Sequence, residues 1–492
     1  MIDRRTLLMA GASGLAACAT SATPDAVGDA EFRALLERIA QADPRERLVA
    51  IAAFDERRLS PGGRILFEAV APGALAESLI VAFPWAQGSA PYAVTHRAGA
   101  YRNANPDARE IERETAAIEA AAAAGVIAPD FVLDAAISSI DARAARFGGD
   151  VAAAMGRQSA VLSALRARAP TEAGLWAQPG GETYYEMSLH MQLGEAVAPR
   201  DAHHRALAAC QALQSEADTL LRARGLTDGS VAERLRAFAA DERQLYADNA
   251  EGKAQAVADM NAALARVRSP LSAVLPGGDV AAEVRPVPQN MEAGGAAGRR
   301  EGNLYFVDLG RARPRWTLAS VAYHELVPGH ITQAAFEREA HPPALQVRYA
   351  GGYSEGWAIY AENLADLLGM YGEDPASRIG YLQWMLFRFG RVVADTGIHA
   401  LRWSRERAIS ELRALQGDSI AFVSIEDDVL RMCAQPGALA AQGLAALRLI
   451  DLRDRYWRRP GFSLARFHDA VLRHGPLSPP GLAQALRVEF GA

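Results

Sequence analysis

The chain has 492 residues and a formal net charge of −6, with 52 basic and 58 acidic side chains. No run of basic residues is interleaved with aromatic ones, so the sequence lacks the electrostatic pattern of a nucleic-acid-binding protein. We therefore expect no nucleic-acid partner. Half of the residues are hydrophobic and 22% are charged, which is typical of a chain with a well-buried core.

The first 18 residues resemble a bacterial export signal and are set aside from the fold. Arg4 and Arg5 precede a short apolar stretch, as in a twin-arginine signal, and the following Leu-Ala-Ala-Cys sequence resembles a lipoprotein cleavage box. Cleavage there would leave Cys18 as the lipidated first residue, followed by a short tether over residues 19–28. The alternative is a frayed N-terminal helix.

The residue after the cysteine bears on the membrane to which such an anchor would attach. Ala19 is not the aspartate that typically retains lipoproteins at the inner membrane. We therefore expect an exported protein of the periplasm, anchored by its lipid to the outer membrane.

Helical periodicity dominates the rest of the chain, and strand signals are few. The predicted helices cover residues 29–58, 107–125, 149–168, 201–224, 230–266, 317–327, 355–370, 376–393, 404–416, 438–458 and 463–474. The aromatic and β-branched segment 303–309, bounded by glycines, predicts a strand. Because no Pro/Ser-rich linker divides the chain, we expect a mainly α fold. Residues 29–492 would form one large helical domain with a small β-sheet.

Two cysteines, Cys210 and Cys433, lie beyond the lipidation site. Neither belongs to a Cys-x-x-Cys pattern, so the sequence indicates no cysteine-based zinc site or redox pair. An exported protein permits a disulfide between them, but we expect both to be small buried hydrophobic residues.

Residues 324–330, which read HELVPGH, contain the residue types of a catalytic zinc centre. Such a centre uses three protein ligands and keeps one position open for water or substrate. In the usual H-E-x-x-H pattern, the second histidine follows one helical turn after the first. Here Pro328 occupies that place, and His330 follows six residues after His324. Six residues of regular helix turn through roughly 600° and rise about 9 Å, so the two imidazoles would diverge.

A local distortion would remove this difficulty. Pro328 lacks a backbone donor and clashes with the carbonyl group of His324, while Gly329 tolerates unusual dihedral angles. We expect a kink or bulge here that lets His330 swing back toward the metal. The alternative is that His330 only caps a helix that ends at Val327.

A third ligand is expected from the predicted helix that begins near residue 355. Glu355 and Glu362 are seven residues apart and share a helix face, but they lie about 10 Å apart along its axis. We expect Glu355 to bind the metal and Glu362 to make an outer contact or a salt bridge. Ser354 is a candidate N-cap. The alternative places both glutamates on a solvated helix face.

The segments His324–Gln333 and Tyr353–Glu362 resemble the two signatures of domain-of-unknown-function family 885, which is placed with the glutamate-zincin peptidases. The similarity continues through Arg391–Trp403. The resemblance implies that His324, His330 and Glu355 hold one zinc ion and that Glu325 is the general base. Ala438 departs from the pattern, because relatives tend to carry a glutamine there and a tyrosine after it. Any substrate contact from that tyrosine would need another donor here.

Several further residues are candidates for contacts with substrate. Asp395 and His399 stand four residues apart, so the carboxylate could orient the imidazole, and we expect His399 to act on the developing oxyanion or on a substrate carboxylate. A structural pair is the alternative. Tyr305 and Tyr360 are possible donors or core residues. Arg391 is a candidate for binding a peptide terminus or for structural pairing.

Two other expectations concern the surroundings of this motif. The strand at 303–309 would lie beside the metal-binding helix, either as an edge strand that pairs with an extended peptide or as an ordinary buried strand. His203 and His204 lie in a polar helical stretch without metal-ligand spacing, so we expect both to be exposed.

These patterns predict a zinc-dependent hydrolase that cleaves peptide bonds through a metal-activated water, with Glu325 as general base and Glu325 and His399 as the catalytic residues. The catalytic part would lie at about residues 300–405. The alternative is a non-catalytic, metal-binding exported lipoprotein with a structural or partner-binding role.

Overall fold

A computed structural model describes residues 26–83, 85, 90–288, 298–310, 314–372, 374–418, 420 and 423–491. The predicted export signal, Cys18 and residues 19–25 of the predicted tether lie outside these residues, whereas residues 26–28 belong to the first helix. The protein is mainly α-helical and forms a single domain with one small sheet. Within the described part of the chain, no helix combines the length and the apolar character needed to cross a membrane.

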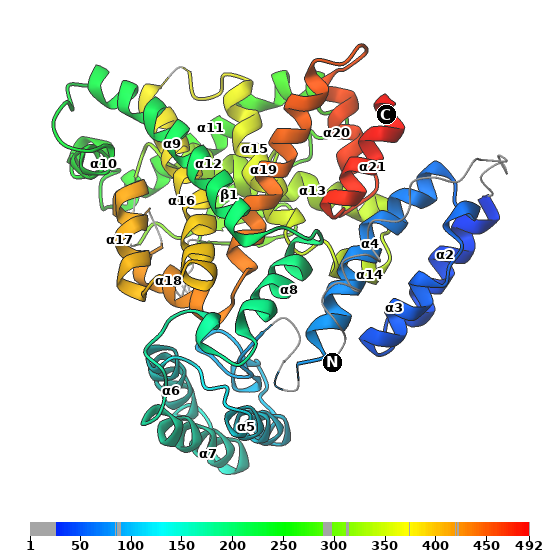
Figure 1. Ribbon diagram of the computed structural model, residues 1–492. Coiled ribbons are helices and arrows are strands. Elements are labelled where there is room, and N and C mark those ends of the chain that lie inside the picture. Colours follow the sequence, from blue (N-terminus) through cyan, green and yellow to red (C-terminus); the bar gives the residue numbers. More distant parts are fainter. Residues whose placement is uncertain are drawn as a thin grey trace.

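The helices follow one another along the whole chain, and Figure 1 shows their arrangement. In chain order they are α2 (Ala26–Ile39), α3 (Pro44–Ala52), α4 (Pro61–Ile80), α5 (Ala108–Ala123), α6 (Asp130–Ala144), α7 (Gly149–Arg166), α8 (Gly181–Leu193), α9 (Pro199–Ala223), α10 (Val231–Ala239), α11 (Ala250–Val274), α12 (Leu318–Glu325), α13 (His330–Ala340), α14 (Ala344–Arg348), α15 (Tyr353–Leu367), α16 (Pro375–Ala400), α17 (Arg405–Gln416), α18 (Ile425–Ala434), α19 (Ala438–Trp457), α20 (Leu464–Leu472) and α21 (Pro479–Phe490).

Helix α16 is the axis of the fold. Asp374 caps its first turn by accepting hydrogen bonds from the backbone N–H groups of Ala376 and Ser377, and Pro375 occupies the first helical position. From Ile379 to His399 the helix is buried on almost every side, as expected for a helix that is apolar all round. It packs along α9, α17 and α19, while α15 packs along α19, so these helices form the centre of the molecule (Figure 1).

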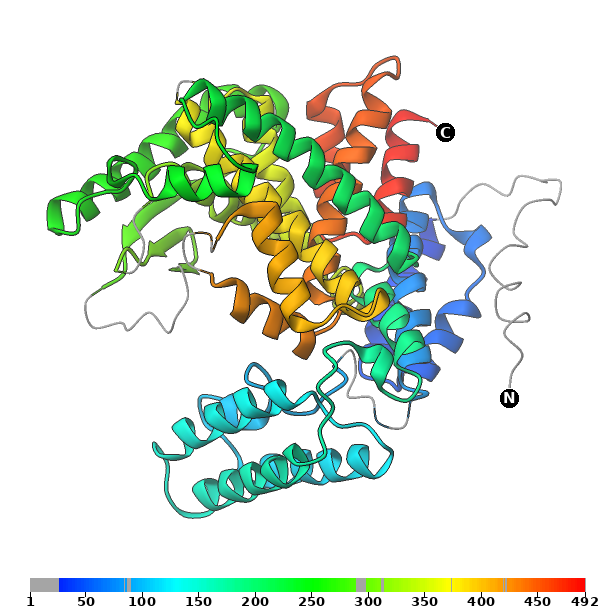
Figure 2. The same ribbon diagram turned by 60° about the vertical axis from the view of Figure 1, so that its left-hand side comes forward.

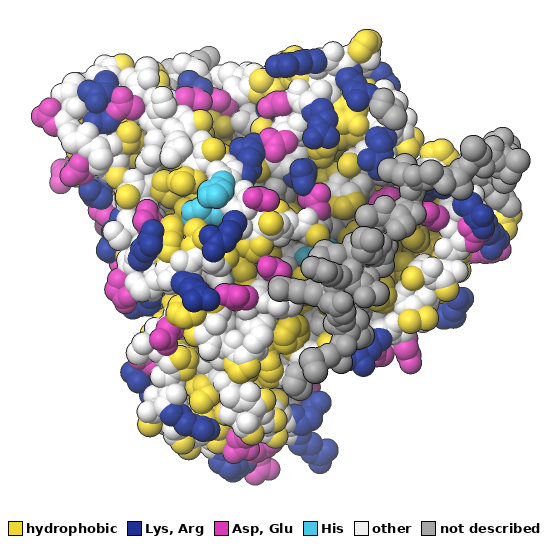
Figure 3. Space-filling view, in the orientation of Figure 1, with side chains coloured by type: hydrophobic (Ala, Val, Ile, Leu, Met, Phe, Trp, Pro, Cys, Tyr) yellow, Lys and Arg dark blue, Asp and Glu magenta, His cyan; other side chains and the backbone are white. Residues whose placement is uncertain are grey.

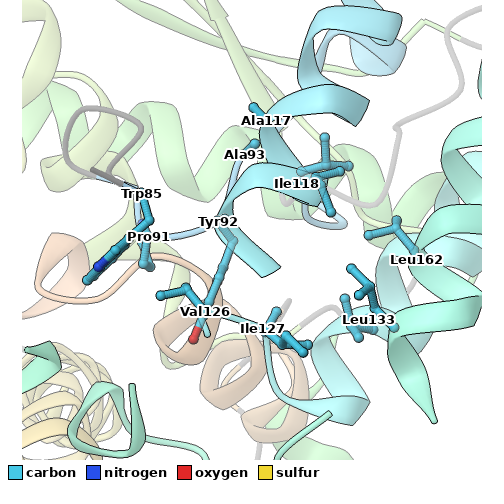
Figure 4. Close-up of a pocket in the computed structure, with 14 residues that line it drawn as sticks. Trp85, Pro91, Tyr92, Ala93, Ala117, Ile118, Val126, Ile127, Leu133 and Leu162 are labelled. Atoms are coloured by element: carbon cyan, nitrogen blue, oxygen red, sulfur yellow. The ribbon is translucent and has the colours of Figure 1, made fainter. Parts of the chain in front are cut away.

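Helices α5, α6 and α7 form a separate layer below this centre (Figure 2). An apolar pocket lies within the layer, and Figure 4 shows Ile118, Leu133 and Leu162 pointing into it. Its volume is about 30 Å³, which is the room of about one water molecule. The pocket is therefore a gap in the packing of the core. On the face shown in Figure 3, acidic and basic side chains are interspersed among apolar ones.

The sheet has three short strands, β1 (Glu283–Pro286), β2 (Gly298–Glu301) and β3 (Leu304–Val307). Their order is β1-β3-β2, with β1 parallel and β2 antiparallel to β3. The strand predicted at 303–309 is confirmed as β3, but its placement at an edge is wrong. β3 is central because β1 covers one side of it and β2 covers the other. The outer strand β2 places Arg300 opposite Tyr305 of β3.

Two of the predicted helices are interrupted by capping residues. Residues 29–58 form α2, α3 and a 3-10 turn, because the side chain of Asp43 accepts from the N–H of Arg45 and starts a new helix before Pro44. Residues 230–266 divide into α10 and α11, and Asn249 caps the second of them. The patterns did not reveal α4, α6, α8, α13, α14, α18 and α21.

Candidate metal centre

The helix that carries His324 breaks within the HELVPGH segment. α12 ends at Glu325 and α13 begins at His330, with Leu326 and Gly329 in extended or irregular conformations and a cis peptide bond before Pro328. A Cβ atom on Gly329 would lie only 1.9 Å from the carbonyl oxygen of His324, so only glycine fits here. The structure therefore contains the interruption that Pro328 and Gly329 predict. Because the helix is broken here, the imidazoles of His324 and His330 do not point away from each other as they would on a regular helix.

The break brings His324, His330 and Glu355 together. Each of the three offers one ligand atom, and these atoms lie within 4.8 Å of one another. Nε2 of His324 is 3.6 Å from one carboxylate oxygen of Glu355, and Nε2 of His330 is 3.5 Å from the other. Two atoms that bind a tetrahedral zinc ion at about 2.0–2.1 Å are about 3.4 Å apart. The two distances from the histidines to Glu355 thus fit a zinc ion, and the role of the three residues as ligands stays a prediction.

A buried carboxylate orients His324. Nδ1 of His324 donates to Oε1 of Glu362 over 2.8 Å, and the other oxygen of Glu362 accepts from the hydroxyl of Ser320 over 2.9 Å. The Glu362 side chain is only 1% exposed. Since Nδ1 carries the hydrogen, the lone pair of Nε2 faces Glu355, which is the arrangement that a metal-binding histidine needs.

A hydroxyl group orients His330 in the same manner. Oγ of Ser354 lies 3.1 Å from Nδ1 of His330 and donates its own hydrogen to Oε1 of Gln333 over 3.0 Å. The hydroxyl oxygen must therefore accept from His330, which leaves Nε2 of this ring without a hydrogen. The expectation that Ser354 caps a helix is wrong, because α15 begins at Tyr353 and Ser354 lies within its first turn.

The centre is buried on the side of Glu362 and open on the side of Glu355, whose side chain is 32% exposed. A cleft of about 840 Å³ borders His330 and Ser354 and continues toward Asn303. Of the three donors, His330 borders this cleft and Glu355 is partly exposed, so a ligand can approach the centre from the side of these two residues.

Glu325 is the last residue of α12 and does not belong to the three-donor set. Its side chain is 24% exposed, and one carboxylate oxygen lies 3.4 Å from Nη1 of Arg300 on β2. The carboxylate is thus held beside the centre by the sheet and stays accessible to a water molecule.

Arg388 of α16 is the residue that the sequence analysis missed. Its Nη2 lies 3.3 Å from Nε2 and 3.4 Å from Nδ1 of His324, and its Nε lies 3.8 Å from Oε1 of Glu362. The side chain is only 11% exposed. A charged residue in a largely apolar helix is a signal, but Arg391 and Asp395 of the same helix share it, so it does not single out Arg388.

Residues 89–486 match the family described as "Bacterial protein of unknown function (DUF885)". The chain belongs to this family. The match includes all the residues of the candidate metal centre, together with α16 and the sheet.

Two solved structures share the fold of this DUF885 member. The structure titled "The crystal structure of the putative lipoprotein from Colwellia psychrerythraea" has 24% sequence identity and a TM-score of 0.78, over 94% of this chain and 91% of that one. A "putative lipoprotein of unknown function from Shewanella oneidensis" has 16% identity and a TM-score of 0.67, over 94% and 93%. None of the curated proteins matches the chain.

The predicted pair of Asp395 and His399 does not form in this DUF885 protein. The carboxylate of Asp395 accepts from the hydroxyl of Tyr185 over 2.6 Å and from the N–H of Gly437 over 3.1 Å. These partners lie on α8 and in the turn before α19. They satisfy the carboxylate in place of the imidazole of His399. Burial raises the pKa of Asp395 to about 7.

His399 is instead held by two backbone groups. Nδ1 accepts from the N–H of Leu175 over 3.1 Å, and Nε2 donates to the carbonyl oxygen of Met432 over 3.2 Å. Burial lowers the pKa of His399 to about 4, so the ring is neutral at pH 7. Both ring nitrogens are thus engaged by backbone groups, as in the structural alternative.

Three other candidates for substrate contacts have structural partners. The hydroxyl of Tyr360 lies 2.9 Å from Nε2 of His468 in the core, and Arg391 makes a buried two-point ion pair with Asp428 over 2.6 and 2.7 Å. Tyr305 is also buried, and burial together with nearby Glu325 raises the pKa of its hydroxyl. The core and pairing alternatives thus describe where these residues lie.

The remaining expectations concern the surface and the cysteines. His203 is buried, because it lies on the face of α9 that packs along α16, and its Nδ1 lies 3.0 Å from the hydroxyl of Thr396. The expectation of exposure is wrong for His203, whereas His204 is exposed. Cys210 and Cys433 are buried free cysteines, as expected.

Proposed function

We propose that the protein is a zinc-dependent hydrolase of peptide bonds, with the ion held by His324, His330 and Glu355 and with Glu325 as the general base. One observation carries the proposal. Both imidazoles have Nδ1 engaged by a fixed acceptor, and both direct Nε2 at the same solvent-accessible carboxylate. Two histidines and a glutamate are the ligands of one common class of catalytic zinc site.

The residues around the centre divide the chemical tasks between them. A zinc ion in such a site lowers the pKa of a bound water to about 7 and polarises the substrate carbonyl. Glu325 accepts a proton as the water oxygen bonds to the carbonyl carbon and the π electron pair moves to the carbonyl oxygen. The carbonyl then re-forms, the C–N bond breaks, and Glu325 returns the proton to the leaving amine. Arg300 keeps the carboxylate of Glu325 in place throughout.

We also propose that the protein is exported and carries a lipid on Cys18. The support comes from the arginine pair and the cleavage-box sequence before Cys18, and from the two similar structures, which are described as lipoproteins. The outer membrane is the proposed location because of Ala19. Fractionation of the membranes, followed by mass spectrometry of the N-terminal peptide, tests this. An unmodified N-terminus in the soluble periplasmic fraction would contradict it.

Substitution of the general base separates catalysis from metal binding. We expect Glu325→Gln to keep one zinc ion per chain but to cleave a mixed peptide library roughly 10²–10⁴-fold more slowly, because the amide cannot accept the proton. Glu339→Gln is the matched control, since Glu339 is exposed on α13 and lies outside the centre. Zinc content is measured by metal analysis and cleavage by mass spectrometry.

The outcomes distinguish the proposal from its competitor. Unchanged cleavage by Glu325→Gln would overturn the mechanism. If the wild type binds zinc and cleaves no peptide, the proposed activity fails and the non-catalytic, metal-binding lipoprotein becomes the better description. The cleavage sites on the library would also show whether the enzyme acts internally or from one end of a peptide.

A further inference from the structure

We propose that Arg388 binds the oxyanion that forms on the substrate carbonyl during hydrolysis. This inference rests on the proposed peptidase function. That function needs a hydrogen-bond donor for the oxyanion, and no other residue has been assigned to this role. It follows from the position of the guanidinium group, from its unused hydrogen-bond donor and from the charge balance of the centre.

The position places Arg388 next to the reacting atoms. Its Nη2 lies 3.3 Å from Nε2 of His324, the nitrogen that is directed at Glu355 and at the proposed ion. A carbonyl oxygen polarised in this centre would therefore lie within reach of the guanidinium group.

The donors of Arg388 are not used up by the fold. Its Nε is buried and has no hydrogen-bond partner among the described residues. Oε1 of Glu362 is 3.8 Å away from this atom, too far for a hydrogen bond, and it already accepts from His324 over 2.8 Å. The guanidinium lies over the rings of Trp384 and Phe387, at 4.9 and 5.4 Å from their centroids. The rings hold the group in place without occupying its N–H donors.

Arg391, one turn later on α16, provides an internal comparison. Its guanidinium also lies over Phe387, at 3.9 Å from the ring centroid. It differs from Arg388 because Asp428 accepts two hydrogen bonds from it and neutralises it. Helix α16 thus carries two largely buried arginines whose guanidinium groups lie over the ring of Phe387. Of these two, only Arg391 has a carboxylate at hydrogen-bond distance.

The net charge of the centre is positive when Arg388 is counted. Glu355 and Glu362 together carry two negative charges, which balance a zinc dication. Glu325 is paired with Arg300. Nε of Arg388 lies 3.8 Å from Oε1 of Glu362, but with Arg388 included these groups and the ion carry one net positive charge in the ground state. An oxyanion that develops on the substrate supplies the missing negative charge, so Arg388 interacts more strongly with the transition state than with the substrate.

The donors that the sequence suggested for this role are engaged elsewhere. Both ring nitrogens of His399 bind backbone groups, and the hydroxyl of Tyr360 is bonded to His468. The negative charge that develops on the substrate oxygen, as the C–O π electron pair moves to it, would thus be met by the guanidinium group of Arg388. The same pair returns when the C–N bond breaks, and Arg388 gains or loses no proton.

The test compares binding of a tetrahedral anion with binding of a neutral analogue. The probes are N-phosphoryl-leucyl-alanine and N-acetyl-leucyl-alanine, titrated calorimetrically into zinc-loaded and chelator-treated protein. The proteins are wild type, Arg388→Met, Arg388→Lys and the matched control Arg391→Met. In zinc-loaded Arg388→Met, we expect the phosphoryl compound to bind roughly 10²–10³-fold more weakly and the acetyl compound to change little.

The two further variants separate recognition from folding. Arg388→Lys keeps the charge next to Glu362 but loses the forked donor geometry, so we expect an intermediate loss. Arg391→Met removes a buried ion pair and should lower the melting temperature while leaving the ratio of the two affinities unchanged. Equal weakening of both probes by Arg388→Met, unchanged affinity for the phosphoryl compound, or no binding of it by the zinc-loaded wild type would overturn the inference.

Cleavage of the peptide library by the same variants keeps the two proposals apart. A wild type that cleaves no peptide contradicts the proposed function, on which this inference depends. A wild type that cleaves peptides and an Arg388→Met variant that cleaves them equally fast contradict only the role of Arg388. We expect Arg388→Met to lower kcat by roughly 10²–10³-fold with a smaller change in KM.

Discussion

Four of the buried histidines of this protein fall into two pairs that differ in what the second ring nitrogen contacts. In His399 and His468, both nitrogens have partners. His399 binds the backbone of Leu175 and Met432, and His468 binds Tyr360 and the carbonyl oxygen of Val274. In His324 and His330, one nitrogen is fixed by a hydrogen bond and the other faces Glu355.

The difference shows that burial alone does not identify a functional histidine. All four rings are buried, and all four lie within or at the ends of helices. A ring whose two nitrogens are satisfied by neutral groups holds the fold together, since removing it leaves buried polar groups without partners. A ring with one oriented nitrogen and one directed at a shared carboxylate is prepared for a ligand.

The largest expected effect comes from exchanging one histidine of each group for alanine. We expect His330→Ala to weaken zinc binding by more than roughly 100-fold, because it removes a direct ligand rather than an outer contact. His399→Ala should leave zinc affinity unchanged but lower the free energy of unfolding by about 3 kcal/mol, because the Leu175 N–H and the Met432 carbonyl lose their partner. Zinc affinity is measured by competition with a chelator and stability by urea unfolding of the metal-free proteins.

The same two variants can also contradict this division of the histidines. Loss of zinc from His399→Ala at full stability would mean that His399 belongs to the metal centre after all. Strong destabilisation of metal-free protein by His330→Ala, with zinc affinity retained, would place His330 among the structural histidines.

The sequence predicts the first group better than the second, for a physical reason. His324, His330 and Glu355 are found from local patterns, because the ligands lie close together in the chain and the Pro-Gly break is encoded between them. The partners of His399 come from residues 175 and 432, which only the packing of distant helices brings together. Helical spacing placed Asp395 near His399 but could not reveal that Tyr185 competes for it.

The same distinction between local and distant determinants applies to the fold. Apolar periodicity identified most of α9, α16 and α19, whose buried faces are long. β1 and β2 were not predicted, because their sequences are polar and only the backbone bonds to β3 define them as strands. Arg388 was missed because its importance depends on which helix lies against α16, and that information is absent from the helix itself.

The next expected effect concerns acid. Burial lowers the pKa of His468 from 6.5 to about 4, so the unfolded chain binds a proton between these values that the folded chain excludes. Stability is therefore complete above pH 6.5 and falls as the pH decreases toward 4, by up to about 3 kcal/mol for this residue. Urea unfolding of the metal-free wild type and His468→Gln between pH 7 and pH 4 measures this, and the variant should show a shallower loss.

The sign of this effect separates His468 from Asp395. Burial raises the pKa of Asp395 to about 7, so its contribution falls as the pH rises toward 7 and opposes that of the histidines. Because Asp395 is present in both proteins, it cancels in the difference between wild type and His468→Gln. A pH-independent difference would show that folding does not shift the pKa of His468.

The smallest expected effects come from the outer partners of the two ligand histidines. Glu362→Gln keeps an acceptor for Nδ1 of His324 but removes a buried charge, whereas Ser354→Ala removes a neutral acceptor from His330. Hydrogen bonds to charged groups are roughly twice as strong as neutral ones. We therefore expect zinc affinity to fall toward 100-fold for Glu362→Gln and by about 10-fold for Ser354→Ala, as chelator competition would show. The reverse order would mean that geometry at His330, rather than charge behind His324, limits how tightly the centre holds its ion.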